Sequence, residues 1–323
     1  MNITFRDFDS SDSDYQICNE IYNACWPEHK QSIASVKHDD QTRDPNHFFR
    51  KVVLEWGSET LGYGFFREKW WAKDSNEYST NLFISPTASI PFEDAAVAFN
   101  HFMLQQLALR QPKKLTISML EDRTDLIDFY KSAGYKLIQR EPTSELDVRQ
   151  FDFERFADAE QKIIAKGFKI YTLGELKEKF ENWQQLDYEL LEPIIQDIPS
   201  ETERTEFPFA EFIKEYDIPT FMFEANYYAI ECKTQKWVGM SSLNKDDGNP
   251  DYLKVGLTGV RKSYRGKGLA TALKVKTIEF ARDYGASFIK TENDENNSMF
   301  DLNLMLGFKP KPAFVTYELQ LTS

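Results

Sequence analysis

The pattern of apolar residues changes its period once between residues 253 and 284. Apolar residues alternate with polar or small ones from Leu253 to Leu257, which predicts a strand. From Leu269 to Tyr284 they recur at helical spacing, and Gly285 ends this run, which predicts a helix. The residues between the two elements form the predicted turn, Val260-Arg-Lys-Ser-Tyr-Arg-Gly-Lys-Gly-Leu-Ala270.

The same order of elements is predicted twice along the chain, as in an internal repeat. Each half predicts a hairpin, a third strand, a helix, a further strand, and a segment that ends in glycine and an aromatic residue. The segments are 52–66, 82–84, 92–109, 115–119 and 129–135 in the first half, and 228–240, 253–260, 269–284, 287–291 and 302–308 in the second. We expect an α/β (α+β) fold of two tandem units, each a mixed, mostly antiparallel sheet flanked by helices.

Residues 151–167 separate the two halves. They are rich in charged residues and helix formers, which predicts a connecting helix, and the next strand is predicted at 168–172. The sequence therefore predicts domains at 1–152 and 153–323.

Composition narrows the class of protein. A chain of 323 residues with 41% hydrophobic and 15% aromatic residues can form two cores, so disorder is not expected. A net charge of −13 disfavours a nucleic-acid partner, because phosphate binding needs a basic face. There is no apolar run of membrane length and no signal peptide, which predicts a cytoplasmic protein without a membrane partner. Cys18, Cys25 and Cys232 lack CxxC spacing, so we expect reduced thiols and no metal site.

The predicted turn has the residue types of an anion site. Gly266 and Gly268 let a ligand approach the backbone, and the following helix directs its N–H groups and positive dipole end there. The turn also carries four basic residues, Arg261, Lys262, Arg265 and Lys267. The spacing does not fit a Walker A loop, and a Rossmann fingerprint needs a glycine where Thr271 stands. An ordinary glycine-containing turn with solvated charges is the alternative.

Two motifs in this region resemble those of a known family. The turn resembles motif A of the GNAT N-acetyltransferases, Arg/Gln-x-x-Gly-x-Gly/Ala, here Arg265-Gly-Lys-Gly268-Leu-Ala270. The run from Thr291 to Phe308 resembles motif B, which ends in Gly-Phe. The resemblance implies an acyltransferase that takes acetyl-CoA as its co-substrate and uses no metal.

The resemblance also implies a set of cofactor-binding residues. The end of the strand would contribute backbone groups to the pantetheine and the acetyl carbonyl, through Thr258, Gly259 and Val260. The pyrophosphate would lie on the turn and the first helical residues, Arg265, Gly266, Lys267, Gly268, Leu269, Ala270 and Thr271. Asn293 or Asn296 would contact the cofactor further along, although such an Asn-rich loop also suits simple turn chemistry.

The first half departs from motif A. Its residues at the three motif positions are Ser89, Phe92 and Asp94. A phenylalanine ring and a carboxylate at the start of a helix both oppose a pyrophosphate, so we expect no acetyl-CoA site there. A degraded first copy with an intact second is similar in architecture to the mycothiol-synthase-like tandem GNAT proteins.

Acetyl transfer to an amine needs a neutral amine, a donor to the developing oxyanion, and a proton for the thiolate. A lysine-like amine of pKa about 10.4 costs roughly 4 to 5 kcal/mol to deprotonate at pH 7, so the base matters most. At the positions where many family members have a tyrosine acid and a glutamate base, this chain has Asn303 and Lys254. The catalytic residues stay unknown. The candidates are Glu231, Asp251 and Asn303, and a solvated surface position is the alternative for the two carboxylates.

Residues 187–224 are the predicted acceptor region. They combine many carboxylates with aromatic residues, which could select an amine by charge and by cation–π contact. A solvated acidic face is the alternative.

The sequence thus predicts an N-acetyltransferase that acts on the primary amine of a small, cationic or neutral acceptor. The amine would attack acetyl-CoA directly in a ternary complex. The alternatives are a non-catalytic acyl-CoA-binding sensor or scaffold, and a peptide or protein N-acetyltransferase. The acceptor, the acyl length and the oligomeric state are left open.

Overall fold

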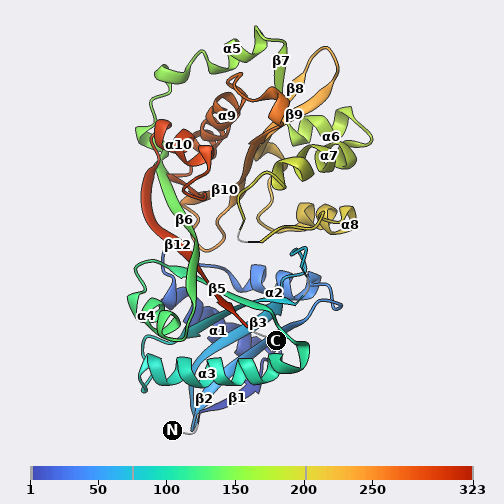
Figure 1. Cartoon of the computed structure of the whole chain (residues 1–323). Coiled ribbons are helices and arrows are strands. Elements are labelled where there is room, and N and C mark those ends of the chain that lie inside the picture. Colours follow the sequence, from blue (N-terminus) through green and yellow to red (C-terminus); the bar gives the residue numbers. More distant parts are fainter. Residues whose placement is uncertain (1–2, 75, 201, 322–323) are drawn as a thin grey trace. The chain divides into compact units, whose positions relative to one another are not determined.

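The computed structural model describes residues 3–74, 76–200 and 202–321 (Figure 1). The chain forms two compact units. The first unit contains the described residues of 1–140, 200–205 and 312–323, and the second contains those of 141–199 and 206–311.

The first unit contains a mixed sheet in the strand order β1-β2-β3-β4-β5-β12. Neighbouring strands are antiparallel except for the parallel pair β4 and β5. The strands are β1 (Thr4–Asp7), β2 (Phe49–Trp56), β3 (Glu59–Glu68), β4 (Glu77–Ile84), β5 (Lys114–Leu120) and β12 (Lys309–Gln320). The helices are α1 (Asp12–Cys25), α2 (Ile33–Thr42), α3 (Phe92–Leu107) and α4 (Thr124–Ser132), with a short 3-10 turn η1 (Ala108–Arg110). The next 3-10 turn, η2 (Val148–Gln150), already belongs to the second unit.

Both faces of this sheet are buried. Leu54 and Phe66 pack with Phe99 of α3 on one face, whereas Val53 packs with Cys18 of α1 on the other. Consecutive residues of one strand enter opposite cores, as the two-residue period of a strand requires. Cys18, Cys25 and Cys232 are all free thiols.

The second unit contains a mixed sheet in the order β6-β11-β10-β9-β8-β7, antiparallel except for β10 and β11. The strands are β6 (Lys136–Asp147), β7 (Phe168–Thr172), β8 (Asn226–Glu231), β9 (Lys236–Lys245), β10 (Tyr252–Val260) and β11 (Phe288–Glu292). The helices are α5 (Ala159–Ile164), α6 (Leu173–Lys179), α7 (Trp183–Ile195), α8 (Phe209–Phe212), α9 (Leu269–Tyr284) and α10 (Ser298–Met305). The 3-10 turns are η3 (Glu154–Phe156), η4 (Ile213–Asp217), η5 (Phe223–Ala225) and η6 (Lys262–Tyr264).

Helices also cover both faces of this sheet. On one face Val275 and Ile278 of α9 pack on Leu253 and Ile289. On the other face α6 and α7 build an aromatic core with β8 and β9, which includes Tyr228. The two faces of the sheet are named below by these helices, the α9 face and the α7 face.

The last strand of each half of the sequence belongs to the sheet of the other half. Residues 143–147 of β6 pair with β11, and residues 314–320 of β12 pair with β5. The sequence pattern does not anticipate this exchange, because alternation shows that a strand exists and not which strand it pairs with. The predicted domain boundary, between residues 152 and 153, stays a prediction.

The predicted elements are largely confirmed, and α9 begins and ends where the pattern places it. The connecting helix over 151–167 is wrong in extent, because α5 contains only Ala159–Ile164. Phe151 instead packs on Phe153 and Phe156, with ring centroids 4.8 and 5.3 Å apart. Burial of these aromatic rings overrides the weak helix propensity of the segment.

Candidate active site

The two parallel strands of the second unit diverge. Residues Tyr252–Lys254 of β10 pair with Phe288–Lys290 of β11. Beyond these residues β10 remains paired with β9, and β11 remains paired with β6. We call the opening beyond the last pair, Lys254 with Lys290, the fork. A backbone that leaves its partner in this way exposes peptide groups to a ligand.

A β-bulge in β10 lies on one side of the fork, between Val255 and Thr258. The Ser242 hydroxyl accepts a hydrogen bond from the Leu257 N–H at 2.8 Å, so a side chain provides the acceptor for one backbone donor of the bulge. A Cβ atom on Gly256 would stand 2.7 Å from Ser242 Oγ. A larger residue there would displace the Ser242 side chain, so glycine fits beside the hydroxyl that bonds the bulge.

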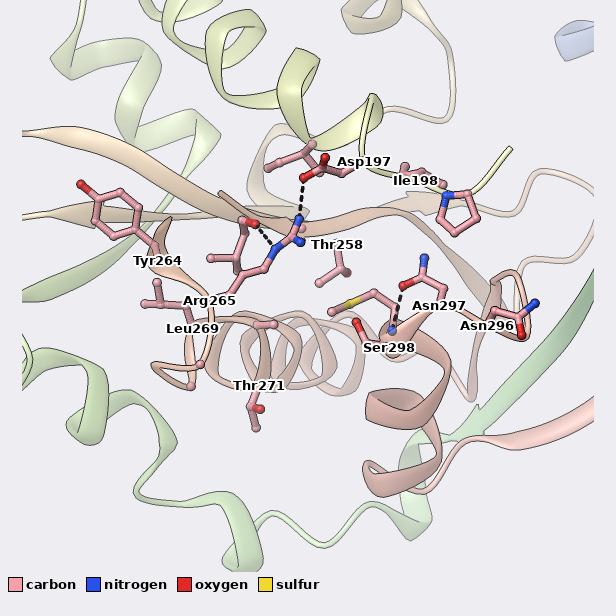
Figure 2. Close-up of a pocket in the computed structure, with 18 residues that line it drawn as sticks. Asp197, Ile198, Thr258, Tyr264, Arg265, Leu269, Thr271, Asn296, Asn297 and Ser298 are labelled. Carbon is pink, nitrogen blue, oxygen red and sulfur yellow. Dashed lines mark hydrogen bonds and ion pairs between the residues drawn. The ribbon is translucent and has the colours of Figure 1, made fainter. Parts of the chain in front are cut away.

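A cavity of about 540 Å³ lies next to the fork, at the carboxyl end of β10 (Figure 2). Four segments line it: the end of α7, the end of β10, the turn with the start of α9, and the start of α10. The lining residues are Ile194, Asp197, Ile198, Pro199, Thr258, Gly259, Val260, Tyr264, Arg265, Gly266, Gly268, Leu269, Ala270, Thr271, Asn296, Asn297, Ser298 and Met299.

The turn that starts α9 has the backbone of an anion site. Gly266 and Gly268 have φ angles of +75° and +87°, where other residues are strained. A Cβ on either would meet no atom within 4 Å, so space is open beside them. Gly268 caps α9 without a side-chain hydrogen bond. The first N–H groups of the helix thus have no intrahelical acceptor, and the first helical residues, Leu269, Ala270 and Thr271, line the cavity.

Two basic residues of the turn, Arg265 and Lys262, bind the carboxylate of Asp197, which lies just after α7. Arg265 donates from Nε to the Val260 carbonyl at 3.0 Å and from Nη2 to Asp197 at 2.9 Å (Figure 2). Lys262 Nζ lies 2.5 Å from the other Asp197 oxygen. The hydrogen bond from Lys262 is the largest cause that lowers the pKa of Asp197 below its ordinary value. A carboxylate thus lies where an anionic ligand would meet these cations.

The other two basic residues hold the turn in place. Arg261 donates to the backbone carbonyls of Trp237 and Glu189, at 3.0 and 2.7 Å. The Lys267 ammonium lies 4.8 Å from the centroid of the Tyr264 ring. Of the four basic residues, only Arg265 is among the described residues that line the cavity, and Lys262 is connected to it through Asp197. The cluster of four predicted from the sequence thus divides into a pair that binds Asp197 and a pair that holds the turn.

The strand wall of the cavity is close-packed. The Thr258 and Ser241 hydroxyls are 2.8 Å apart, and both residues are buried. A Cβ on Gly259 would overlap Ile194 Cγ2. The missing side chain of Gly259 therefore allows α7 to pack directly on β10.

The asparagines after β11 have different positions. Asn296 lines the cavity, as do Asn297 and Ser298, which sequence reasoning missed. Asn297 caps α10 by accepting the Met299 N–H at 3.0 Å, a pattern that asparagine before a helix could have signalled. Asn303 is fully buried and donates to Asn293 Oδ1 at 2.6 Å, so neither of this pair lines the cavity.

The two candidate carboxylates lie away from the lining residues. Glu231 accepts hydrogen bonds from Thr234 at 2.5 Å and Tyr264 at 3.2 Å, and the first of these is the largest cause of its lowered pKa. A lowered pKa makes a carboxylate a weaker base. Asp251 is exposed, and its backbone carbonyl accepts the Ser287 N–H at 2.9 Å.

Two other carboxylates, Asp187 and Asp246, are buried. Asp187 Oδ2 accepts hydrogen bonds from Tyr216 at 2.9 Å and Tyr228 at 3.1 Å in the aromatic core, and burial raises its pKa to about 7. Asp246 lies 3.5 Å from Lys254 Nζ. Sequence reasoning gave neither a separate role, because burial is decided by tertiary packing.

The predicted acceptor region, 187–224, is not one acidic surface. Asp187 is in the core, Asp197 binds the turn, and Glu211 pairs with Lys214 at 2.7 Å. Within residues 3–74, 76–200 and 202–321, no group of His, Cys, Asp and Glu is arranged to hold a metal ion. No helix of this described part has the length and apolar character to cross a membrane.

Comparison with known proteins relates the second unit to one family. Residues 180–308 match the model of the acetyltransferase (GNAT) family. No curated protein matches the sequence.

Solved structures resemble the whole chain. A tandem GNAT protein from the clavulanic acid biosynthesis pathway has 16% identity and a TM-score of 0.73, over 100% of this chain and 99% of that one. A GCN5-related N-acetyltransferase from Sphaerobacter thermophilus has 14% identity and a TM-score of 0.67, over 98% and 95%. A GCN5-related glucosamine N-acetyltransferase region of a fungal multi-domain GH3 β-N-acetylglucosaminidase has 9% identity and a TM-score of 0.71, over 98% of this chain and 38% of that one. At these identities the likeness concerns the fold.

Proposed function

We propose that this chain, an acyltransferase with a GNAT domain at residues 180–308 in a tandem GNAT fold, transfers acetyl from acetyl-CoA to a primary amine. The acceptor is a small neutral or cationic molecule. The observation that carries this proposal is the uncapped start of α9, where Gly266 and Gly268 open its N–H groups to the cavity.

The cavity residues have separate tasks in this proposal. The N–H groups of the turn and of α9's first residues, up to Thr271, bind the pyrophosphate. The backbone of Thr258 to Val260 binds the pantetheine and directs the thioester toward the fork, and Asn296 contacts the cofactor from the α10 side. No cysteine is among the described residues that line the cavity, which supports direct attack by the amine instead of an acyl-cysteine intermediate.

A matched pair of glycines tests the cofactor site. Gly268 and Gly285 cap the two ends of α9 with φ angles of +87° and +88°, and both have open space beside them. Alanine should cost each cap a similar amount of stability, about 1 kcal/mol. Only Gly268→Ala places a methyl group at the pyrophosphate, so we expect its CoA affinity to fall tenfold or more in titration calorimetry. Equal CoA affinities for the two variants would contradict the proposed site.

Turnover tests the reaction. The parent protein is supplied with acetyl-CoA and an amine panel of glucosamine, tyramine, spermidine and amino acids, and the release of the CoA thiol is measured. We expect release that depends on one class of amine and is lost in Gly268→Ala at subsaturating acetyl-CoA. A preference for carboxylate-bearing acceptors with net negative charge would contradict the proposed acceptor class.

A non-catalytic acyl-CoA-binding sensor is the second candidate. It is favoured because the two acidic groups that line the cavity already have partners. The Asp197 carboxylate is bound by Lys262 and Arg265, and the Tyr264 hydroxyl donates to Glu231. This candidate predicts CoA binding without thiol release for every amine of the panel.

A further inference from the structure

The end of β11 places a carboxylate at the fork. Glu292 lies two residues beyond Lys290, which makes the last pair with β10. Side chains of a strand alternate, so Glu292 points to the same face of the sheet as Lys290. Ile289 and Thr291 point to the other face of the strand, and both are buried. Ile289 packs with α9. Glu292 is therefore on the α7 face, opposite to α9.

The bulge of β10 lies across the fork from this carboxylate. Because Lys254 pairs with Lys290, continued parallel pairing would bring Gly256 opposite Glu292. Gly256 is exposed, and the Ser242 and Asn244 side chains of β9 lie on the side where a Cβ would project. The backbone of Glu292 pairs with Thr143 of β6, which fixes the end of β11. One side of the fork is thus the glycine-containing bulge of β10, and the other side bears a carboxylate.

The charged residues on this face are Lys254, Lys290, Asp246 and Glu145 of β6, which pairs with Lys290 and accepts a hydrogen bond from the Tyr252 hydroxyl at 3.0 Å. Glu292 is the exposed carboxylate among them. Lys254 and Lys290 lie 3.5 and 3.9 Å from the buried Asp246, which balances part of their charge. Glu292 is exposed, so a ligand can reach it from the α7 face. The surrounding protein removes part of the hydration of Glu292 and so raises its pKa, although the side chain keeps contact with solvent, and the two ammonium groups oppose this rise. A carboxylate with a raised pKa is a better proton acceptor at neutral pH.

We propose that Glu292 is the catalytic base that accepts a proton from the acceptor ammonium, an inference that rests on the proposed function. The acceptor approaches from the α7 face, and the thioester lies in the fork against the bulge of β10. Glu231, Asp251 and Asn303 then have no part in proton removal.

The proposed step conserves atoms and charge. One ammonium proton passes to the Glu292 carboxylate, and the freed nitrogen lone pair forms the C–N bond to the acetyl carbon of acetyl-CoA. The C–S bond then breaks, and the departing CoA sulfur takes the second proton from nitrogen. The products are the acetylated amine and CoA thiol. The protonated Glu292 returns its proton to water.

Glu292→Gln tests the proposal, because it keeps the shape of the side chain and removes its titration. Glu295→Gln is the matched control, since Glu295 is exposed in the loop three residues later. Both variants and the parent are assayed with acetyl-CoA and the amine of the panel that the parent acetylates fastest, from pH 6 to pH 10. CoA affinity is measured in parallel by titration calorimetry.

We expect Glu292→Gln to lower kcat/KM about 100-fold at pH 7, with CoA affinity within twofold of the parent. The deficit should shrink toward pH 10, because an amine of pKa about 10 then loses its proton without a base. Glu295→Gln should behave as the parent. A deficit below threefold at pH 7, or one that is the same at every pH, would overturn the role of Glu292 while the proposed function stands. Absence of turnover by the parent with every amine would overturn the proposed function, and this inference with it.

Discussion

The Asp197 carboxylate and the Arg265 guanidinium are joined at 2.9 Å at the mouth of the cavity (Figure 2). Lys262 binds the other oxygen of the same carboxylate at 2.5 Å. Asp197 follows α7, whereas the two cations belong to the turn before α9, so this contact joins two walls of the cavity. It also gives the cations an anionic partner in the same position that the proposed pyrophosphate would take.

Asp197→Asn should therefore strengthen CoA binding. The substitution removes a negative charge from the cavity and leaves Lys262 and Arg265 available to a phosphate. Both cationic side chains are at least half exposed, so we expect a gain of roughly three- to tenfold in affinity, largest at low salt. Titration calorimetry at two salt concentrations measures it. Asp217→Asn, at an exposed position of the same acidic stretch, should leave the affinity unchanged, and weaker binding by Asp197→Asn would show that Asp197 positions Arg265 instead.

Gly259→Ala should destabilise the second unit. The added Cβ overlaps Ile194 Cγ2, and overpacking of this kind costs about 1 to 3 kcal/mol. Ile194→Ala alone should also be destabilising, because it leaves a cavity beside β10. If the two sites are in contact, the double variant should be more stable than the sum of the single changes predicts, by about 1 kcal/mol. Denaturant unfolding gives all four values, and strict additivity would contradict the contact.

Asp187 should make stability depend on pH. Its pKa is about 7 in the folded protein, through burial, and its ordinary value is 3.8. Below pH 3.8 the carboxyl is protonated in both states and has no effect. Between pH 3.8 and 7 only the unfolded state releases the proton, so the folded state loses stability as pH rises, by a few kcal/mol at most, and the loss is constant above pH 7.

Asp187→Asn removes this titration. The stability of the variant relative to the parent should therefore increase from pH 4 to pH 7 and then level off, which melting temperatures across this range measure. The amide oxygen can still accept from Tyr216 and Tyr228, so the aromatic core keeps its hydrogen bonds. A difference in melting temperature that does not change with pH would contradict the raised pKa.

The first unit should bind no CoA. Its α3 begins with Phe92 after Pro91, has no side-chain cap, and carries Glu93 and Asp94 in its first turn. The Ser89 N–H donates to Glu59 at 2.9 Å, so this donor already has a partner. Acidic residues at a helix start repel an anion. We expect one CoA per chain in native mass spectrometry and in calorimetry, and a second site that survives Gly268→Ala would contradict this prediction.

The sequence alone determined the local parts of this protein. A change from a two-residue to a helical period, with Gly266 and Gly268 between, specifies a strand, a left-handed turn and an uncapped helix, because these depend on neighbouring residues. The start of α9, the place of the cavity beside it and the two-unit α/β fold follow from such signals. The family resemblance also came from residues close together in the chain.

Tertiary structure alone decided which distant groups meet. The pairing of Lys254 with Lys290 sets the fork and places Gly256 and Glu292 each two residues beyond the last pair, and strand register is invisible in a pattern that fixes only the faces of one strand. Burial likewise separated Asn303 from the cavity and took Asp187 into the core. Local residue order specifies an element, but the proton chemistry of a site depends on packing and on charges brought together from separate elements.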